Sequence, residues 1–307
     1  MSGCFLLCFS PQASKNDISH ILFTGPSGAG KKTRVAALLR EIFGRGVANI
    51  RTEKKTVGAS ADSAGGGAAS KGVDITVVAS NYHVEVTPAD AGTKDRVVVQ
   101  ELLKEIASTR PVDGATPYKV VVIHEADCLS RGAQDALRRT MERYMRACRV
   151  VLVATAACRV TPAIRSRCAI VRVPLPSRDE LRAVLASVAR EEHIAPLPDA
   201  LAQRIAALAD GNARKALLML EVAKVRAAAD GAPLAEDTPV DRADWEEYVA
   251  QIALDVVKEQ TPRKLAEVRM KVYELLTHCI PPEMILKVCV CTRFRCRQPR
   301  FFILLVI

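Results

Sequence analysis

The chain has 307 residues, of which 49% are hydrophobic and 25% are charged, and its formal net charge is +10. This composition excludes an intrinsically disordered chain and predicts two or three small globular domains, each with its own core. The positive charge favours a polyanionic partner, although four of the ten charges come from a C-terminal tail without acids, at Arg293, Arg295, Arg297 and Arg300.

The ten cysteines form neither a Cys-x-x-Cys pair nor a histidine-containing cluster at zinc spacing. We interpret them as reduced thiols of a cytosolic or nuclear protein and expect no metal bound by them. The opening residues MSGCFLLCFS lack the basic start of a secretory signal, and no run approaches the ~18 apolar residues of a membrane span.

Continuous apolar runs rich in Val and Ile alternate with helical patterns in the first half of the chain. The runs are residues 20–23, 75–79, 119–123, 149–154 and 169–173, and the helical patterns cover 32–43, 95–107 and 133–145. Apolar runs without alternation are typical of strands buried on both faces. The pattern predicts an α/β domain over residues 19–176, with a parallel sheet between helices. Residues 1–18 form an atypical N-terminal segment, and the Gly-rich residues 58–70 are expected to be a flexible loop insertion.

The second half of the chain is predicted to be helical. Ser177 and Glu180 form a capping-box pattern that opens a three-helix domain over residues 177–230, with helices at 177–192, 199–209 and up to residue 228. Residues 231–239 are expected to be a linker. Helices at 245–258 and 262–276 begin a further unit over residues 240–287, and residues 288–307 fit no element and form an unrelated tail.

A glycine-rich loop, GPSGAGKKT, joins the first predicted strand to the first predicted helix. In this context the backbone N–H groups and the positive end of the helix attract phosphates, and Lys31 reaches the terminal phosphates. The alternative is a tight glycine turn followed by two solvated lysines. We predict a site for ATP or ADP formed by Gly25, Pro26, Ser27, Gly28, Ala29, Gly30, Lys31, Lys32 and Thr33.

Two departures from the usual pattern affect the metal ion of such a site. Lys32 stands where a Ser or Thr hydroxyl ligates Mg²⁺, and Thr33 lies one residue later, about 100° further round the helix. His124 precedes Glu125 where an Asp usually holds the metal. Neutral imidazole is a poor ligand for Mg²⁺, and two nearby lysines disfavour its protonation. We therefore expect Mg²⁺ to be weakly bound or absent and hydrolysis to be weak, unless His124 is an ordinary surface residue at a strand end.

Five segments together resemble the replication factor C subunit 3 family, small subunits of the eukaryotic sliding-clamp loader. They are HILFTGPSGAGKKTR, SNYHVEVTPADAG, QDALRRTMERYMRACR, IRSRC and ELLTHCIPPE. The resemblance covers residues 19–287 and implies an AAA+ P-loop domain, a three-helix lid and a truncated helical collar. It also implies a nuclear protein that joins the other replication factor C subunits in a hetero-pentamer. That complex uses ATP to load the sliding clamp onto primer–template DNA in replication and repair.

The resemblance implies roles for single residues. Lys31 corresponds to the phosphate lysine, Glu125 to the catalytic glutamate, Thr155 to the polar sensor and Arg214 to the lid arginine that reaches the nucleotide. Arg167 corresponds to an arginine that acts in trans on a neighbour's ATP, where the plain alternative is a surface arginine.

Other basic residues and other functions stay open. Arg96, Arg138 and Arg139 are candidate contacts to DNA or to an adjacent subunit, or else a solvated basic face. A self-sufficient AAA+ ATPase would turn over ATP alone and lose that activity on Glu125→Gln. A truncated product without a role in assembly would fail to bind the other subunits.

Overall fold

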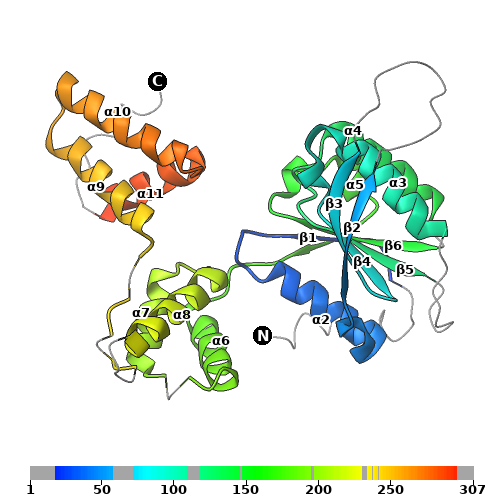
Figure 1. The fold of residues 1–307 in the computed structure, drawn as a ribbon, viewed down its shortest axis with the longest axis horizontal. Helices are drawn as coiled ribbons and strands as arrows, with labels where there is room; N and C mark the ends of the chain where they lie inside the picture. The colour runs from blue at the N-terminus through cyan, green and yellow to red at the C-terminus, as the bar shows by residue number, and fades with distance from the viewer. Residues whose placement is uncertain are drawn as a thin grey trace. The chain divides into compact units, whose positions relative to one another are not determined.

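The computed structural model describes residues 18–57, 72–108, 118–145, 147–194, 197–229, 234–236, 238–240 and 242–295. The predictions for residues 1–17, 58–70 and 296–307 lie outside these described residues. The chain divides into two compact units (Figure 1), one made of Met1–Glu192 and Ala209–Leu217, the other of His193–Leu208 and Leu218–Ile307.

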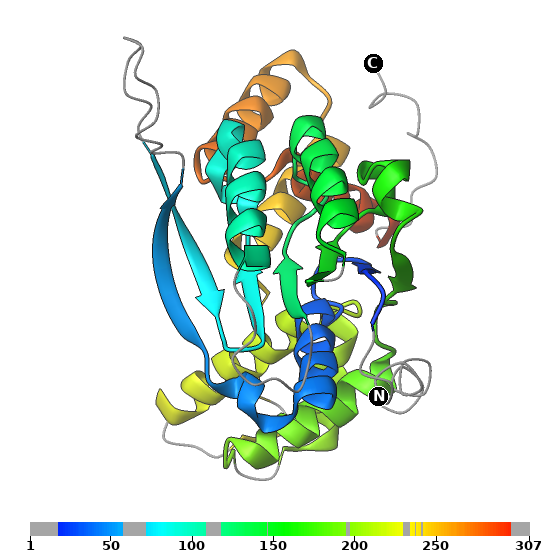
Figure 2. The same cartoon turned by 90° about the vertical axis from the view of Figure 1, so that its right-hand side faces the viewer.

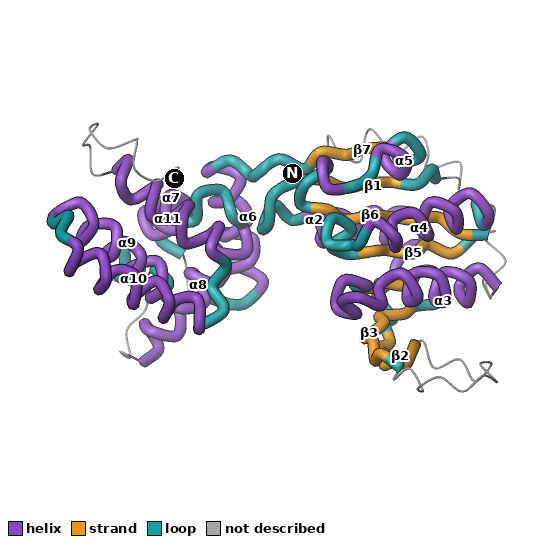
Figure 3. Tube along the Cα trace, turned by 90° about the horizontal axis from the view of Figure 1, so that it is seen from above, coloured by secondary structure: helices purple, strands orange, loops and turns teal. Residues whose placement is uncertain are grey.

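A seven-stranded sheet is the centre of the first unit, in the order β2-β3-β4-β5-β6-β1-β7 (Figure 3). The strands are β1 Ile21–Thr24, β2 Arg51–Val57, β3 Val73–Ala79, β4 His83–Val86, β5 Lys119–Ile123, β6 Cys148–Ala154 and β7 Ala169–Arg172. All pairings from β4 to β7 are parallel, which agrees with the predicted parallel sheet. The β2–β3 and β3–β4 pairings are antiparallel, so the sheet is mixed at one edge.

Two strands, β2 and β4, are not predicted by the apolar runs. The sequence of β2, RTEKKTV, is mostly exposed because β2 is an edge strand and has no need of an apolar face. It forms a long hairpin with β3, visible in blue and cyan in Figure 2. The sequence of β4, HVEV, is short and half polar, so a search for apolar runs passes over it.

The central strands bury alternate residues on opposite faces of the sheet. Helix α2 (Lys31–Phe43) covers one face, and its Leu38 belongs to the same buried cluster as Val120 and Val122. Helices α3 (Asp95–Ser108) and α4 (Arg131–Arg143) cover the other face, where Leu137 clusters with Val121. Helices on both faces confirm the predicted α/β class and explain the apolar runs.

The remaining helices follow the predicted order. Short helices are η1 (Gly44–Ala48), η2 (Pro88–Lys94), η3 (Ala157–Arg159) and α5 (Pro162–Arg165). Helices α6 (Arg178–Glu191), α7 (Asp199–Leu208) and α8 (Ala213–Ala229) occupy the region of the predicted lid. Ser177 and Glu180 form the predicted capping box, in which each side chain accepts a hydrogen bond from the other's backbone N–H.

The last three helices share one apolar cluster. Helices α9 (Asp244–Lys258), α10 (Pro262–Thr277) and α11 (Pro282–Arg295) bury Val249, Ile252, Leu275 and Ile285 together. Helix α11 extends eight residues beyond Lys287, the last residue of the predicted helical unit. The helix continues to residue 295 because no Gly or Pro interrupts residues 288–295 and because Val288 and Cys289 pack against the cluster.

Candidate nucleotide site

Parallel strands bring the predicted motifs to one edge of the sheet. Thr24 at the end of β1 is in register with Ala154 of β6 and Arg172 of β7, and Ile123 of β5 is in register with Leu152. The loops that follow β1, β5 and β6 hold residues 25–30, 124–127 and 155 respectively. The glycine loop, the acidic motif and Thr155 therefore lie at the same edge, which is where ligands bind in open α/β sheets.

The loop between β1 and α2 needs its glycines. Gly28 and Gly30 have φ angles of 77° and 79°, in the left-handed region that favours glycine. A Cβ on Gly28 would lie 1.8 Å from Asn212 Oδ1, and a Cβ on Gly25 would lie 2.2 Å from the Val173 carbonyl oxygen. The loop is thus fixed in shape by the segments around it.

The first turn of α2 is suited to an anion. Gly30 caps the helix and has no side chain to satisfy the N–H groups of the first turn, which has no acidic residue. Pro26, Ser27, Lys32 and Thr33 are exposed or half-buried, whereas Ala29 is buried. This arrangement is suited to the predicted phosphate-binding role of the loop.

Lys31 lies among charged groups from three segments. Its ammonium donates hydrogen bonds to the carbonyl oxygens of Gly25 at 2.5 Å and Pro26 at 2.9 Å. Partial burial lowers the pKa of Lys31, the carboxylate of Asp127 acts in the opposite direction, and the guanidinium of Arg214 lowers the pKa further. Asp127 and Arg214 are therefore near enough to Lys31 to act on its charge.

Arg214 is brought to this site by a direct contact between α8 and the glycine loop. The backbone N–H of Ala213 donates to the Gly28 carbonyl at 3.1 Å, and Asn212 Oδ1 accepts from the Lys215 N–H at 3.1 Å. Asn212 therefore caps α8 while packing against Gly28. The loop patterns do not single out Asn212, because its role depends on a contact between segments almost two hundred residues apart.

The acidic motif is joined to the end of β6. The carboxylate of Asp127 accepts hydrogen bonds from the backbone N–H groups of Thr155 at 3.2 Å and Ala156 at 3.4 Å. Glu125 is exposed and has φ 53°, a conformation that non-glycine residues adopt rarely and often at functional sites. The motif pattern identifies Glu125 but not Asp127, although the acid two residues later was a visible signal.

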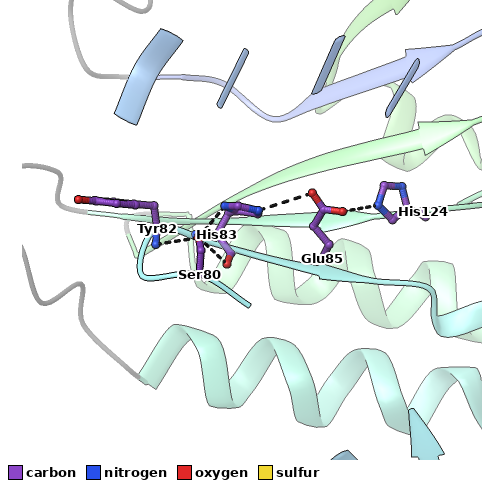
Figure 4. A network of polar contacts seen from close by, with 5 residues as sticks. All are labelled: Ser80, Tyr82, His83, Glu85 and His124. Carbon is purple, nitrogen blue, oxygen red and sulfur yellow. Dashed lines mark hydrogen bonds and ion pairs between the residues drawn. The ribbon is translucent and has the colours of Figure 1, made fainter. Parts of the chain in front are cut away.

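His124 is buried, with 5% of its surface exposed, which corrects the alternative of a surface residue at a strand end. Its Nε2–H donates to Glu85 Oε2 at 3.0 Å, because an ionised carboxylate can only accept (Figure 4). The other oxygen of Glu85 lies 3.5 Å from His83 Nε2, and His83 Nδ1 contacts the Ser80 hydroxyl at 2.7 Å. Glu85 is thus held between two imidazoles.

The two histidines stabilise the charge of Glu85. Hydrogen bonds from His124 and then His83 lower the pKa of Glu85 to about 2. The sequence motifs predict two lysines near His124 but do not predict its carboxylate partner, Glu85. The alternation His83-Val84-Glu85-Val86 places both polar side chains on one face of β4. This alternation is the feature of the sequence from which the pairing of His83 with Glu85 could have been predicted.

The motif residues do not fit a magnesium ion held by two protein oxygens. Lys32 offers an ammonium at the hydroxyl position, and the Nε2 of His124 is engaged by Glu85. Within the described ranges, no group of three or more His, Cys, Asp or Glu side chains is arranged to hold a metal ion.

Arg167 has partners on α4 and in the segment that precedes it. Its guanidinium donates to the Ala163 carbonyl at 2.7 Å and lies 2.7 Å from Glu142 Oε1 on α4. Arg138 shares the same oxygen of Glu142 at 3.5 Å.

Arg96 and Arg139 face a common hollow, whereas Arg138 does not line it. The hollow lies between α3 and α4 and is lined by Arg96, Gln100, Gly132, Asp135, Ala136 and Arg139. Two of the three candidate contacts to DNA or to an adjacent subunit therefore lie at the same hollow.

Comparison with known families agrees with this architecture. Residues 5–177 match the family described as DNA polymerase III, delta subunit, and residues 183–225 match the RCF1/5-like AAA+ ATPase lid domain. Residues 245–298 match the C-terminal domain of replication factor C subunit 3. The first and last matches extend into residues 1–18 and 288–307, which the sequence patterns leave unassigned.

Similar proteins include replication factor C subunits from distant eukaryotes. The chain is 46% identical to replication factor C subunit 3 of Mus musculus, over 88% of this chain and 73% of that protein. It is 46% identical to the Arabidopsis thaliana subunit 3, over 89% and 75%. Identity to replication factor C subunit 5 of Schizosaccharomyces pombe is 39%, over 90% and 75%.

Solved structures show the same fold at low identity. The Thermotoga maritima RuvB Holliday junction branch migration motor matches with a TM-score of 0.58 and 15% identity, over 96% of this chain and 87% of that one. Among the described residues, no helix has the length and apolar character needed to cross a membrane.

Proposed function

The chain belongs to the replication factor C family, and we propose that it is a clamp-loader subunit that binds ATP and hydrolyses it weakly at its own site. It assembles with other replication factor C subunits in the nucleus, where the complex places a sliding clamp on primer–template DNA. Its Arg167 acts on the ATP bound by a neighbouring subunit.

The arrangement around Lys31 supports this proposal. The phosphate cradle, Lys31 and Arg214 are together, while Lys32 and the Glu85-bound His124 occupy the two positions from which Mg²⁺ is usually held. Binding can depend on fixed cationic charge and main-chain N–H groups, but phosphoryl transfer depends on neutralising the phosphate charge as it develops. Loss of both metal anchors therefore reduces hydrolysis more than binding.

Titration of ATP into the purified chain, with Mg²⁺ or with EDTA, tests this separation. We expect affinities that agree within about threefold under the two conditions, and a loss of more than about tenfold on Lys31→Ala. Lys54→Ala, which removes an exposed lysine of β2, is the matched control. ATP binding that requires Mg²⁺, or rapid turnover abolished by Glu125→Gln, would instead identify a self-sufficient ATPase.

The role of Arg167 is tested in the assembled complex. Arg167→Ala is expected to leave ATP binding by this chain unchanged and to lower hydrolysis at the neighbouring site by up to about 10³-fold, since an arginine supplied in trans can contribute that much. Unchanged hydrolysis would exclude the role in trans. Failure of the chain to co-purify with the other subunits would indicate a product without an assembly role.

A further inference from the structure

Glu142, near the end of α4, holds the guanidinium of Arg167. Glu142 Oε1 lies 2.7 Å from Nη2, and Nη1 donates to the Ala163 carbonyl at 2.7 Å and contacts the Ser166 hydroxyl at 3.4 Å. These contacts use at most three of the five N–H donors of an arginine. The side chain of Arg167 remains 38% exposed, so it is held in place and still accessible to another molecule.

The segment leading to Arg167 is fixed to the same helix at a second point. Gln134 is 2% exposed, and its Oε1 accepts from the Thr161 N–H at 2.8 Å. Its Nε2 donates to the carbonyl oxygens of Leu129 at 3.1 Å and Arg159 at 3.2 Å. Gln134 and Glu142 are eight residues apart on α4, so the helix fixes the backbone before Arg167 at one point and its guanidinium at another.

We propose that Glu142 is a positioning residue that pre-orders Arg167 for its action on the neighbouring subunit's ATP. A free arginine side chain loses rotamer freedom when it binds a phosphate, and a side chain already held in one arrangement loses less. The planar fork allows Glu142 and Ala163 to occupy one side while other N–H groups contact phosphate. This inference rests on the proposed role of Arg167 in trans.

The size of the effect is limited by solvent. Both side chains are about 40% exposed, and exposed ion pairs contribute little. We therefore expect Glu142→Ala to lower kcat for hydrolysis by the assembled complex about two- to fivefold, with KM and assembly unchanged. Glu142→Gln keeps the shape and one acceptor oxygen and should retain part of the rate.

A control variant separates positioning from general surface effects. Glu105→Gln removes a similarly exposed carboxylate that pairs with Lys55 at 2.6 Å. This variant should not lower the rate. In the Arg167→Ala background, Glu142→Ala should have no further effect, because Glu142 acts only through Arg167.

The outcomes distinguish this inference from the proposed function. If Arg167→Ala leaves the rate unchanged, the role in trans fails, and the inference with it. Only the positioning role fails if Arg167→Ala lowers the rate but Glu142→Ala leaves the rate unchanged or raises it. The same holds if Glu142→Ala lowers the rate by the same factor in the native chain and in the Arg167→Ala background. In the free chain, NMR should show slow rotation of the Arg167 guanidinium that becomes faster in Glu142→Gln, and an unchanged rotation rate would also overturn the positioning role.

Discussion

At the scale of single residues, Gly28 lies so close to Asn212 that a side chain there would clash. Gly28→Ala should reduce the free energy of unfolding by about 1–2 kcal/mol from its positive φ alone, with a further loss because the new Cβ would lie 1.8 Å from Asn212 Oδ1. Denaturant unfolding measures the total, and ATP affinity should fall as the loop shifts.

Gly30→Ala is the matched control for that substitution. Gly30 has nearly the same φ, 79° against 77°, but a Cβ added there would meet no atom of the described residues within 4 Å, apart from its own chain neighbours and helix backbone. It should show the backbone cost without the clash. Equal losses of stability in the two variants would show that the Asn212 contact contributes nothing.

Glu85 gives a prediction for pH. Its pKa is about 2 in the folded chain and ordinarily 4.5, so its stabilising effect is present above pH 4.5 and is lost as the pH falls towards 2. The loss is on the order of 3 kcal/mol, at 1.36 kcal/mol per pH unit of displacement. Urea unfolding between pH 5 and about pH 2 should therefore show a steep fall in the native chain and a flatter one in Glu85→Gln.

Glu105→Gln should leave that pH dependence unchanged, because Glu105 is 54% exposed in its pair with Lys55. A Glu85→Gln variant with the native slope would mean that the two histidines do not stabilise the carboxylate.

The residues that sequence patterns identify in the site are those that lie in one continuous motif. Lys31 and Glu125 follow directly from a loop or strand end of known spacing. Glu85 and Asn212 act through contacts with segments distant in the chain, namely His124 and Gly28. A single sequence does not show which distant segments come into contact in the fold.

At the scale of elements, burial explains which strands and helices could be predicted. The runs that became β1, β5 and β6 are buried on both faces, so their apolar character is continuous. Edge strand β2 has no such requirement, and the end of α11 depends on packing by Val288 and Cys289 rather than on a regular pattern. The solvent exposure of β2 and the tertiary packing of α11 therefore explain why apolar patterns did not predict β2 or the last turns of α11.

The hollow between α3 and α4 predicts a contact with nucleic-acid phosphate. Arg96 and Arg139 lie at the same hollow, and each phosphate contact adds ~0.9 to the slope of log affinity against log salt. In the assembled complex, Arg96→Ala with Arg139→Ala should reduce that slope by about 2, as measured by fluorescence anisotropy with primer–template DNA at several salt concentrations.

Arg138→Ala is the control on the same helix, since its guanidinium is directed to Glu142 at 3.5 Å. A slope that stays the same in the double variant, or changes as much with Arg138→Ala, would contradict a DNA contact at this hollow.

At the scale of the whole molecule, the cluster shared by α9, α10 and α11 is expected to support assembly. Leu275 is 3% exposed in this cluster, and truncation of a buried leucine costs about 2–5 kcal/mol. Leu275→Ala should lower recovery of the chain with the other replication factor C subunits and leave its ATP affinity unchanged, because the phosphate cradle belongs to the other compact unit.

Leu265→Ala, on the same helix but 69% exposed, should assemble normally unless Leu265 itself contacts another subunit. Normal recovery of Leu275→Ala, measured by affinity purification of the complex, would contradict a role for this cluster in assembly.

The hydrogen bonds of Lys31 to the carbonyl oxygens of Gly25 and Pro26 affect how ligand affinity should be understood. Gly25 and Pro26 accept from two of the three N–H donors of the ammonium, so a phosphate has one donor left and gains another only by displacing a carbonyl oxygen. Nucleotide capture at Lys31 is therefore partly an exchange of partners, and its affinity depends on the difference between two sets of contacts.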